Sequence, residues 1–380
     1  MIRIGIDCYN LEGETKAHRA GVGRHIYHLL EEIHKNKALK DTYRFYLYFR
    51  AGIPDDIPFL DNDIFVPKVA KLPFFLPFFR PSYLVYFNIA LPIRLLLDRV
   101  KLIFLPAFLL PFVCPAKSVV VLPNDIYYEM NNKKMPLRYR IGYKVFANNA
   151  ALRATKIITQ SYASRDEIQN KKFLRKRNIG VIPLGVHTID VQSTKTVPKE
   201  KLLFYLGQAF PRRHLYETLL AFEKIADEFP DYSFLAVGVD RYNPPIINKT
   251  VEEINARLGA ERIKRKESIT DEELLENFMK ATVFFYISSS EGMGMPPLEA
   301  LAYGTAPVVA DTGTTREQFQ DNAFFVANPD SVDEIADMMR YALQHPEERK
   351  KIEQNGKERM ANYSWKRHAD SMIELFEKMV

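Results

Sequence analysis

The sequence predicts an α/β protein made of two doubly wound domains, each with a parallel sheet between layers of helices. Short apolar runs rich in β-branched and aromatic residues, typical of buried parallel strands, alternate with amphipathic helical patterns. The chain has 380 residues, too many for one ordinary hydrophobic core, so two domains of roughly 180 residues are expected. A polar stretch without periodicity, His187–Lys199, is typical of a linker. We therefore expect one domain in residues 1–190 and another in residues 198–363.

The composition is that of a soluble globular protein, because 47% of the residues are hydrophobic and 26% are charged. The net charge of +6 is compatible with phosphorylated substrates, anionic lipid or nucleic acid and does not choose among them. Cys8 and Cys114 lack the spacing of a metal site, so we expect a reducing compartment and no disulfide. The amino terminus reads as a strand without the long apolar core of a signal peptide, which favours a cytoplasmic protein.

The first strand is predicted at Ile2–Asp7, before a glycine-containing loop and a helix with one apolar side. The apolar positions of this helix are Val22, Ile26, Leu29, Leu30 and Ile33. Gly21 and Gly23 lie where the helix begins. A strand, a glycine loop and a helix in this order can form an anion site at the helix start. Alternatively, the glycines serve only the tight turn from strand to helix.

The second strand is predicted at Tyr43–Phe49, and the acidic triplet Asp61–Asp63 follows it in a loop. Two aspartates with this spacing can hold a divalent ion against a diphosphate. We interpret the triplet as a solvated turn, because it lies far in sequence from the glutamates described below.

The segment Leu72–Pro115 combines leucines and aromatic residues with seven prolines. Cations in and beside it are Lys68, Lys71, Arg80, Arg94, Arg99 and Lys101. No apolar run in it reaches the roughly 18 to 20 residues that a membrane-spanning helix needs. Two interpretations stay open: an apolar and cationic surface that lies on an anionic leaflet, or ordinary core elements of the first domain. In either case Lys101–Leu105 and Lys117–Leu122 are predicted to be strands.

The rest of the first half continues the alternation of strands and helices. The strand that ends at Leu122 leads into Asn124 and Asp125, at the carboxyl end where ligands of parallel sheets bind. Further predicted elements are helices at Leu137–Ala154 and Ser161–Lys171, the second capped by Ser161, and strands at Lys156–Gln160 and Ile179–Leu184.

The second half begins with a strand at Lys201–Leu206, followed by Gly207 and by a helix predicted from Leu215 to Phe229. Arg212 and Arg213 precede this helix. They suit a diphosphate, because bidentate guanidinium contacts add to the helix dipole. Alternatively, they are a solvated basic helix start. Further strands are predicted at Ser233–Gly238, Thr282–Ile287 and Thr305–Ala310.

The most informative segment is Ser288–Gly304, which holds two carboxylates, two glycines and a helix start. Glu291 lies in its loop. Gly292 and Gly294 allow the backbone to approach a ligand closely and to turn N–H groups toward it.

The helix in this segment is predicted to begin at Pro296 and Pro297, where a missing N–H is tolerated. This places Glu299 in the first turn. There the helix dipole favours a carboxylate, and the two carboxylate oxygens can accept hydrogen bonds from neighbouring ligand hydroxyls. Alternatively, Glu299 only complements the helix dipole.

The segment resembles the Glu-x7-Glu signature of retaining glycosyltransferases of family 4, with Glu291 and Glu299 as its two glutamates. The match continues through Ala300, Gly304, Pro307, Val308 and Val309, and the departures are Ile287, Met293 and Met295. The loop with Gly21, Gly23 and Arg24 is similar to the family's glycine loop, which lies against the donor.

Two departures from the family pattern concern the chemistry. Gly207 and Arg212 match the family, but Arg213 stands where a lysine is usual and His214 where an asparagine is frequent. Asn124 stands where the family usually has histidine. This change puts a proton transfer at that position in doubt, although the amide can still hydrogen-bond a sugar hydroxyl or a phosphate oxygen.

The resemblance implies a GT-B fold, in which two Rossmann-like domains face each other across a cleft. The first domain would receive the acceptor and the second would bind a nucleotide-sugar, with the C-terminal helix 364–380 crossing back to the first domain. The implied reaction is transfer of a sugar from a nucleoside diphosphate, with retention of configuration and without a metal or other cofactor.

The resemblance also implies a role for each group. Glu299 would hold the ribose hydroxyls, and Glu291 with the backbone of Gly292, Met293, Gly294 and Met295 would hold the sugar. Arg212 and Arg213 would neutralise the departing diphosphate.

The expected partners are a nucleotide-sugar donor and a saccharide or lipid-linked saccharide acceptor, with no nucleic acid. The glycine loop favours a mannose-type donor such as GDP-mannose, by resemblance alone. A lipid-linked acceptor would place the enzyme peripherally on the inner face of the cytoplasmic membrane. The alternative is a nucleotide-sugar-binding protein or scaffold without transferase activity, suggested by Asn124, Arg213 and His214.

Overall fold

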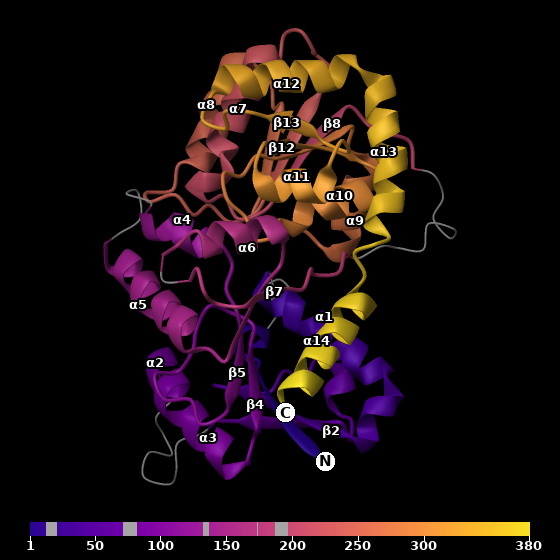
Figure 1. The fold of residues 1–380 in the computed structure, drawn as a ribbon. Coiled ribbons are helices and arrows are strands. Elements are labelled where there is room, and N and C mark those ends of the chain that lie inside the picture. Colours follow the sequence, from indigo (N-terminus) through magenta and orange to yellow (C-terminus); the bar gives the residue numbers. More distant parts are fainter. Residues whose placement is uncertain (13–20, 71–81, 132–136, 173, 187–196) are drawn as a thin grey trace. The chain divides into compact units, whose positions relative to one another are not determined.

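The computed structural model describes residues 1–12, 21–70, 82–131, 137–172, 174–186 and 197–380. The chain forms two compact units (Figure 1). Unit 1 comprises Met1–Gly185 together with Trp365–Val380, and unit 2 comprises Val186–Ser364. Each unit is built on one parallel sheet, as the sequence predicts.

The sheet of unit 1 has seven strands in the order β3-β2-β1-β4-β5-β6-β7. They are β1 (Ile2–Asp7), β2 (Tyr43–Phe49), β3 (Phe65–Val69), β4 (Leu102–Leu105), β5 (Lys117–Val121), β6 (Lys156–Thr159) and β7 (Ile179–Val181). The helices are α1 (Val22–Lys35), α2 (Tyr83–Val85), the π-helix η5 (Tyr86–Ala90), α3 (Leu91–Leu97), α4 (Asp125–Asn131), α5 (Leu137–Arg153), α6 (Tyr162–Gln169) and α14 (Trp365–Met379). Ser161 caps α6 as predicted, because its Oγ accepts a hydrogen bond from the backbone N–H of Ser164 at 3.1 Å.

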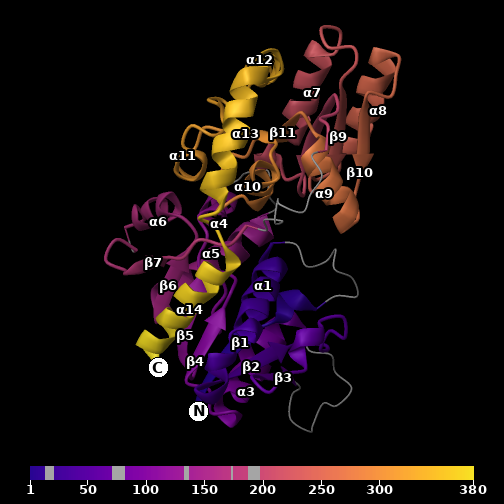
Figure 2. The same cartoon turned by 90° about the vertical axis from the view of Figure 1, so that its right-hand side faces the viewer.

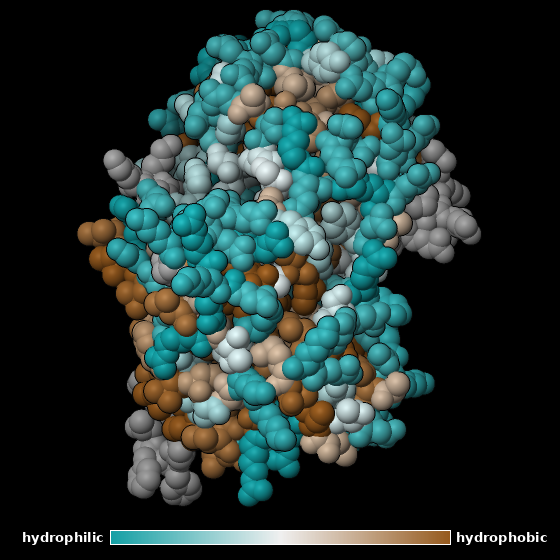
Figure 3. All heavy atoms as spheres, in the orientation of Figure 1, coloured by the Kyte–Doolittle hydropathy of each residue, from teal (hydrophilic) through white to brown (hydrophobic). Residues whose placement is uncertain are grey.

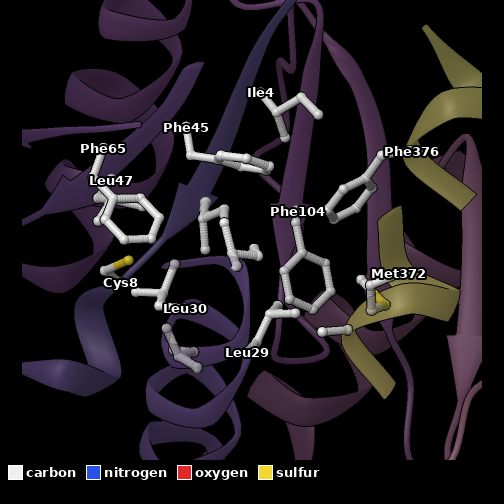
Figure 4. Close-up of a cluster of buried hydrophobic side chains, with 14 of the residues drawn as sticks. Ile4, Cys8, Leu29, Leu30, Phe45, Leu47, Phe65, Phe104, Met372 and Phe376 are labelled. Atoms are coloured by element: carbon white, nitrogen blue, oxygen red, sulfur yellow. The ribbon is translucent and has the colours of Figure 1, made fainter. Parts of the chain in front are cut away.

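The two faces of this sheet carry separate cores, because successive side chains of a strand point to opposite faces. One core packs Ile4, Phe45 and Phe104 against α1 and α14 (Figure 4). The other packs residues such as Ile103 and Val120 against η5, α3 and the alanines of α5. Figure 2 shows α14 alongside α1. The predicted return of the C-terminal helix to the first domain is therefore confirmed.

Unit 2 has a six-stranded sheet in the order β10-β9-β8-β11-β12-β13. Its strands are β8 (Leu202–Leu206), β9 (Ser233–Val237), β10 (Ile263–Lys266), β11 (Val283–Tyr286), β12 (Ala306–Ala310) and β13 (Phe324–Val326). Its helices are the 3-10 turn η6 (Pro211–Arg213), α7 (Leu215–Ile225), α8 (Ile247–Leu258), α9 (Asp271–Lys280), α10 (Met295–Ala302), α11 (Gly313–Phe319), α12 (Val332–Gln344) and α13 (Pro346–Met360).

Two predicted boundaries in unit 2 are wrong. Helix α7 ends at Ile225 rather than Phe229. Lys199 is not a solvated linker residue, because its Nζ donates hydrogen bonds to the carbonyl oxygens of Ala281 and Gly304, at 2.9 and 2.7 Å. Burial is the main cause that lowers the pKa of Lys199 to about 8. The rest of the predicted linker, residues 187–196, lies outside the described residues.

The described part of the segment from Leu72 to Pro115 contains both buried and exposed apolar residues. Residues 71–81 lie outside the described part of the chain. Beyond them, Tyr86, Phe87 and Leu91 are buried core, as the interpretation of the segment as core elements of the first domain requires. Other apolar residues of the segment are exposed: Leu84, Ile89, Leu96, Leu97, Phe112 and Val113. Among the described residues, no helix is long and apolar enough to cross a membrane.

A pair of buried histidines joins α1 to α14. His25 Nε2 lies 2.9 Å from His368 Nε2, and His368 Nδ1 lies 2.8 Å from the carbonyl oxygen of Pro183. Because a carbonyl only accepts, Nδ1 of His368 carries a proton. In neutral His368, Nε2 therefore accepts from the Nε2–H of His25. A second proton on His368 would remove this acceptor.

We expect acid to weaken the α1–α14 junction. Burial lowers the pKa of His25 well below its usual value and that of His368 to about 4. Because the histidines take up protons more readily in the unfolded chain than in the folded one, the free energy of unfolding is at its full value above about pH 6.5. As the pH falls toward 4, it decreases by about 1.4 kcal/mol per pH unit for each proton that unfolding takes up. Urea unfolding of the wild type and of His368→Phe across this range measures the loss. The free energy of unfolding should depend less steeply on pH in the variant than in the wild type. Other titrating groups such as Asp7 are present in both proteins and cancel in the comparison. Equal pH dependence would therefore contradict the assignment.

Candidate active site

The segment with both signature glutamates follows the carboxyl end of β11, a strand whose four residues are all buried. Gly294 precedes α10 with φ of 66°, a left-handed conformation that a residue with a side chain rarely adopts. The helix begins at Met295, one residue earlier than predicted. Glu299 is therefore its fifth residue, and the prediction that it lies in the first turn is wrong. Its side chain is buried, so its placement reflects more than the attraction of the helix dipole.

Glu291 is held by several donors at once. Arg213 donates from Nε to Oε1 at 2.7 Å and from Nη2 to Oε2 at 3.3 Å, a bidentate pair. The hydroxyls of Ser288 and Tyr286 donate to Oε1, at 3.0 and 3.1 Å. Burial alone would raise the pKa of Glu291, but Arg213 and Arg212 together lower it to about 2. Glu291 is therefore ionised at any physiological pH.

Arg212 and Arg213 lie in η6, between β8 and α7, and are tied to the glutamate loop. Arg212 is buried, its Nε donates to the carbonyl oxygen of Ser290 at 3.1 Å, and its Nη2 lies 3.8 Å from Glu291 Oε1. The guanidinium of Arg213 lies over the ring of Tyr286, 5.1 Å from its centroid. The structure thus brings both predicted arginines to one predicted glutamate.

Two glycines allow this close approach. Gly207 has φ of 152°, and a Cβ on it would lie 3.1 Å from the Tyr286 ring and 3.3 Å from Nη1 of Arg213. Gly238, at the end of β9, has φ of 138°, and a Cβ there would lie 1.9 Å from the carbonyl oxygen of Gly207. Gly207 was predicted as a site residue. Gly238 was missed, because only the folded sheet brings it next to Gly207.

His214 follows the arginines in a left-handed conformation, with φ of 43°, at the start of α7. Its Nε2 lies 2.6 Å from Ser289 Oγ, and its Nδ1 lies 3.8 Å from a Glu217 oxygen and 3.6 Å from an Asp330 oxygen. Among the described residues, His214, Glu217 and Asp330 form the one group of side chains close enough together to hold a metal ion. The two carboxylates also suit the imidazole as counter-charges, so the geometry fits a metal-free site as well.

The backbone of the loop is fixed by a neighbouring helix. Met293 is buried, and its carbonyl oxygen accepts a hydrogen bond from the Gln318 side chain of α11. Gly292, Gly294 and Met295 continue the same turn into α10. Gln318 was not predicted from the sequence, because it lies beyond the next strand and α11 carried no recognisable motif.

The remaining predicted residues belong to unit 1. Gly21, with φ of 60°, is the residue before α1, and Gly23 and Arg24 lie in the first turn of that helix. Asn124 is buried beyond the end of β5. Its Nδ2 donates to Glu167 at 2.7 Å, and its Oδ1 accepts from Ser164 at 3.1 Å. These bonds fix the amide against α6, which gives Asn124 a structural function in addition to any contact with substrate.

The Asp61–Asp63 triplet is a surface turn in the structure. Asp63 is exposed and pairs with the ammonium group of Lys40. The prediction of a solvated turn is consistent with this environment.

Comparison with known proteins finds a family that part of the chain resembles. The model of the family described as "Glycosyl transferases group 1" matches residues 187–359. The MMP alpha-(1->4)-mannosyltransferase of Mycolicibacterium hassiacum is 24% identical over 252 residues, which are 65% of this chain and 60% of that protein. The O-antigen chain mannosyltransferase B of Escherichia coli is 27% identical over 174 residues, which are 46% of this chain and 45% of that protein. The chain thus spans about half of the length of these curated relatives.

Solved structures match the whole fold at low sequence identity. A sucrose-phosphate synthase from Thermosynechococcus elongatus superposes with a TM-score of 0.74 and 14% identity, covering 100% of this chain and 99% of that one. WaaG, a glycosyltransferase involved in lipopolysaccharide biosynthesis, gives 0.71 and 13%, covering 98% and 99%. HepE of Anabaena, in complex with UDP and glucose, gives 0.69 and 15%, covering 100% of both chains. The chain therefore has the predicted GT-B fold, and its residues 187–359 match the glycosyl transferases group 1 family.

Proposed function

We propose that this protein is a retaining glycosyltransferase, which moves a sugar from a nucleoside diphosphate to a saccharide or lipid-linked saccharide without a metal. The observation that carries the proposal is the cluster of Arg212, Arg213 and Glu291. Two guanidinium groups face one carboxylate there, among the described side chains, so the cluster is positive overall. It lies at the carboxyl ends of β8 and β11, where ligands of open parallel sheets bind.

The cluster suits the chemistry of diphosphate departure. Negative charge on the diphosphate grows as its bond to the sugar breaks, and fixed cations stabilise that charge without reorganisation. The cations are already oriented by Glu291, Tyr286 and backbone oxygens. Because side chains supply the positive charge, the diphosphate needs no metal ion for neutralisation.

For the donor and acceptor, the proposal follows the relatives. The matched curated proteins are mannosyltransferases by name, two of them in O-antigen chains. We therefore propose a mannose-type donor such as GDP-mannose and an acceptor in cell-surface polysaccharide or glycolipid synthesis. Unit 2 would bind the donor and unit 1 would receive the acceptor, with Gly21, Gly23 and Arg24 of unit 1 against the donor.

The second candidate is a nucleotide-sugar-binding protein without transferase activity. Two observations favour it: Glu291 is engaged in a bidentate pair with Arg213, and the Asn124 amide is engaged with Glu167 and Ser164. In the enzyme, donor binding would exchange part of the Arg213–Glu291 pairing for contacts to diphosphate and sugar.

The deciding experiment incubates the protein with GDP-mannose, UDP-glucose and UDP-N-acetylglucosamine and measures release of the nucleoside diphosphate. Release with one donor, stimulated by a saccharide acceptor and unchanged by EDTA, is expected. Tight binding without release would favour the second candidate. Activity lost in EDTA and restored by Mg²⁺ or Mn²⁺ would contradict the metal-free proposal and direct attention to His214, Glu217 and Asp330.

Glu299→Ala is expected to weaken nucleotide binding by about 1.5 to 3 kcal/mol, as for loss of a hydrogen bond to a charged group. Isothermal titration with the nucleoside diphosphate measures the effect. Glu272→Ala, on the exposed first turn of α9, is the matched control and should bind normally. Unchanged affinity in Glu299→Ala would show that this carboxylate does not hold the ribose.

A further inference from the structure

Helix α5 of unit 1 is apolar on two opposite sides. Its alanines Ala147, Ala150 and Ala151 are buried against the sheet. On the other side Leu137, Ile141, Val145 and Leu152 are 66%, 53%, 47% and 55% exposed. These four residues are spaced by four, four and seven, so they form one stripe along the helix. A surface helix of a soluble protein normally carries polar side chains on that side.

Other exposed apolar side chains lie near α5. The ring of Phe112, which is 41% exposed, lies 5.7 Å from the ring of Phe146 in α5. The backbone N–H of Phe112 donates to Asn88 Oδ1 of η5 at 3.2 Å, next to the exposed Ile89. Val113, which is 68% exposed, extends the same loop. We call this set the α5 surface: the stripe of α5, Phe112, Val113 and Ile89. Figure 3 shows hydrophobic side chains gathered along this side of unit 1.

The charged residues of α5 itself are all positive. Helix α5 contains Arg138, Arg140, Lys144 and Arg153 and no acidic residue. At 100° per residue, Lys144 lies on one flank of the stripe, and Arg138 and Arg153 lie on the other. The loop from Pro106 to Ala116 contains no acidic residue either. An apolar stripe between rows of cations is complementary to a lipid surface with anionic headgroups.

A second copy of the chain fits this surface poorly. Apposing two such stripes would bring the four cations of one α5 close to those of the other, and no acidic side chain of the helix would compensate them. An anionic leaflet supplies both the apolar layer and the counter-charge.

We propose that the α5 surface docks this protein on an anionic lipid bilayer. The exposed aliphatic and aromatic side chains enter the boundary between headgroups and acyl chains, while Arg138, Lys144 and Arg153 contact phosphate groups. Attachment is peripheral. The inference rests on the proposed function for its purpose, because an enzyme on the membrane would meet a lipid-linked acceptor there. Docking itself requires neither donor nor acceptor.

Vesicle flotation tests the proposal, with phosphatidylcholine vesicles that contain or lack phosphatidylglycerol. The wild type should float with the anionic vesicles at low salt and be released at high salt, since each cation contributes roughly fivefold to binding at an anionic surface. Ile141→Glu with Val145→Glu, and separately Arg138→Glu with Lys144→Glu, should each reduce flotation at least tenfold.

Matched controls place the same changes elsewhere. Ile53→Glu alters another exposed isoleucine, and Lys249→Glu with Lys264→Glu alters exposed lysines of unit 2. Both control variants should float like the wild type.

Absence of flotation by the wild type would overturn the proposal, as would normal flotation of the α5 variants. A wild-type dimer in sedimentation that the Ile141 and Val145 changes dissociate would also overturn it, in favour of a second copy as occupant. Release of nucleoside diphosphate with a soluble acceptor should be equal in all variants, so failure of docking and failure of the proposed activity are distinguishable.

Discussion

Replacing Arg213 by alanine is expected to lower the turnover number by about two to three orders of magnitude, as for loss of one preorganised charge-stabilising donor. The guanidinium is the nearest cation to Glu291 and is fixed by Tyr286 and by the carbonyl oxygen of Gln208. Its charge matters most when the diphosphate departs. The effect should therefore fall on kcat more than on KM.

Steady-state kinetics with the donor identified by the release assay checks this prediction. Arg213→Lys is the matched variant: it restores the charge that is usual in the family but loses the second hydrogen bond of the bidentate pair, so its rate should lie between the other two. An unchanged kcat with a raised KM in Arg213→Ala would show that Arg213 only binds the ground state.

The same substitution should also affect folding, for a separate reason. The lowered pKa of Glu291 means that its ion pair stabilises the fold above about pH 4.5, with loss only as the pH falls toward about 2. Without Arg213 the carboxylate stays buried, and removing one partner of a buried pair typically costs about 3 to 5 kcal/mol. Arg213→Ala with Glu291→Gln removes that charge, so it should regain stability without regaining turnover. Recovery of stability in this double variant would show that the folding loss comes from the unpaired carboxylate.

The parts of the fold that follow from local sequence were predictable. The buried strand β11 was predictable from its continuous β-branched and aromatic residues, and β12 from its apolar run. The carboxyl end of β11 located the signature loop. Edge strand β10, Ile-Lys-Arg-Lys, reads as a polar loop because one face of an edge strand is solvated. It was missed for that reason.

The parts that depend on distant contacts were not predictable. Tyr286 looks like an ordinary core residue of a strand, yet its hydroxyl bonds Glu291 and its ring supports Arg213. His25 and His368 meet across 343 positions of sequence. The second apolar side of α5 has no signature, since leucine, isoleucine and valine read the same whether a core or a lipid surface covers them.

The polypeptide passes between the two units twice, after Gly185 and before Trp365, and the two passages lie side by side. Val186 donates its backbone N–H to the carbonyl oxygen of Tyr363 at 2.8 Å, in unit 2. In unit 1, Trp365 is buried at the start of α14 and stacks on His28, with ring centroids 4.7 Å apart. Gly185 is therefore packed directly against the backbone that begins the C-terminal helix.

Gly185→Ala is expected to destabilise unit 1 by about 3 kcal/mol or more, at the upper end of the usual effect of overpacking a buried site. The new Cβ would lie 2.3 Å from the backbone nitrogen of Trp365 and 2.5 Å from its Cα, so no side-chain rotation relieves the contact. Either α14 shifts away from α1, which separates His25 from His368, or the passage after Gly185 deforms. Urea unfolding measures the loss of stability, and hydrogen exchange of the α14 amides should rise in the same variant. Gly52→Ala, whose Cβ would have no atom within 4 Å, is the control and should unfold like the wild type. Unchanged stability and unchanged exchange in Gly185→Ala would contradict close packing of the two passages.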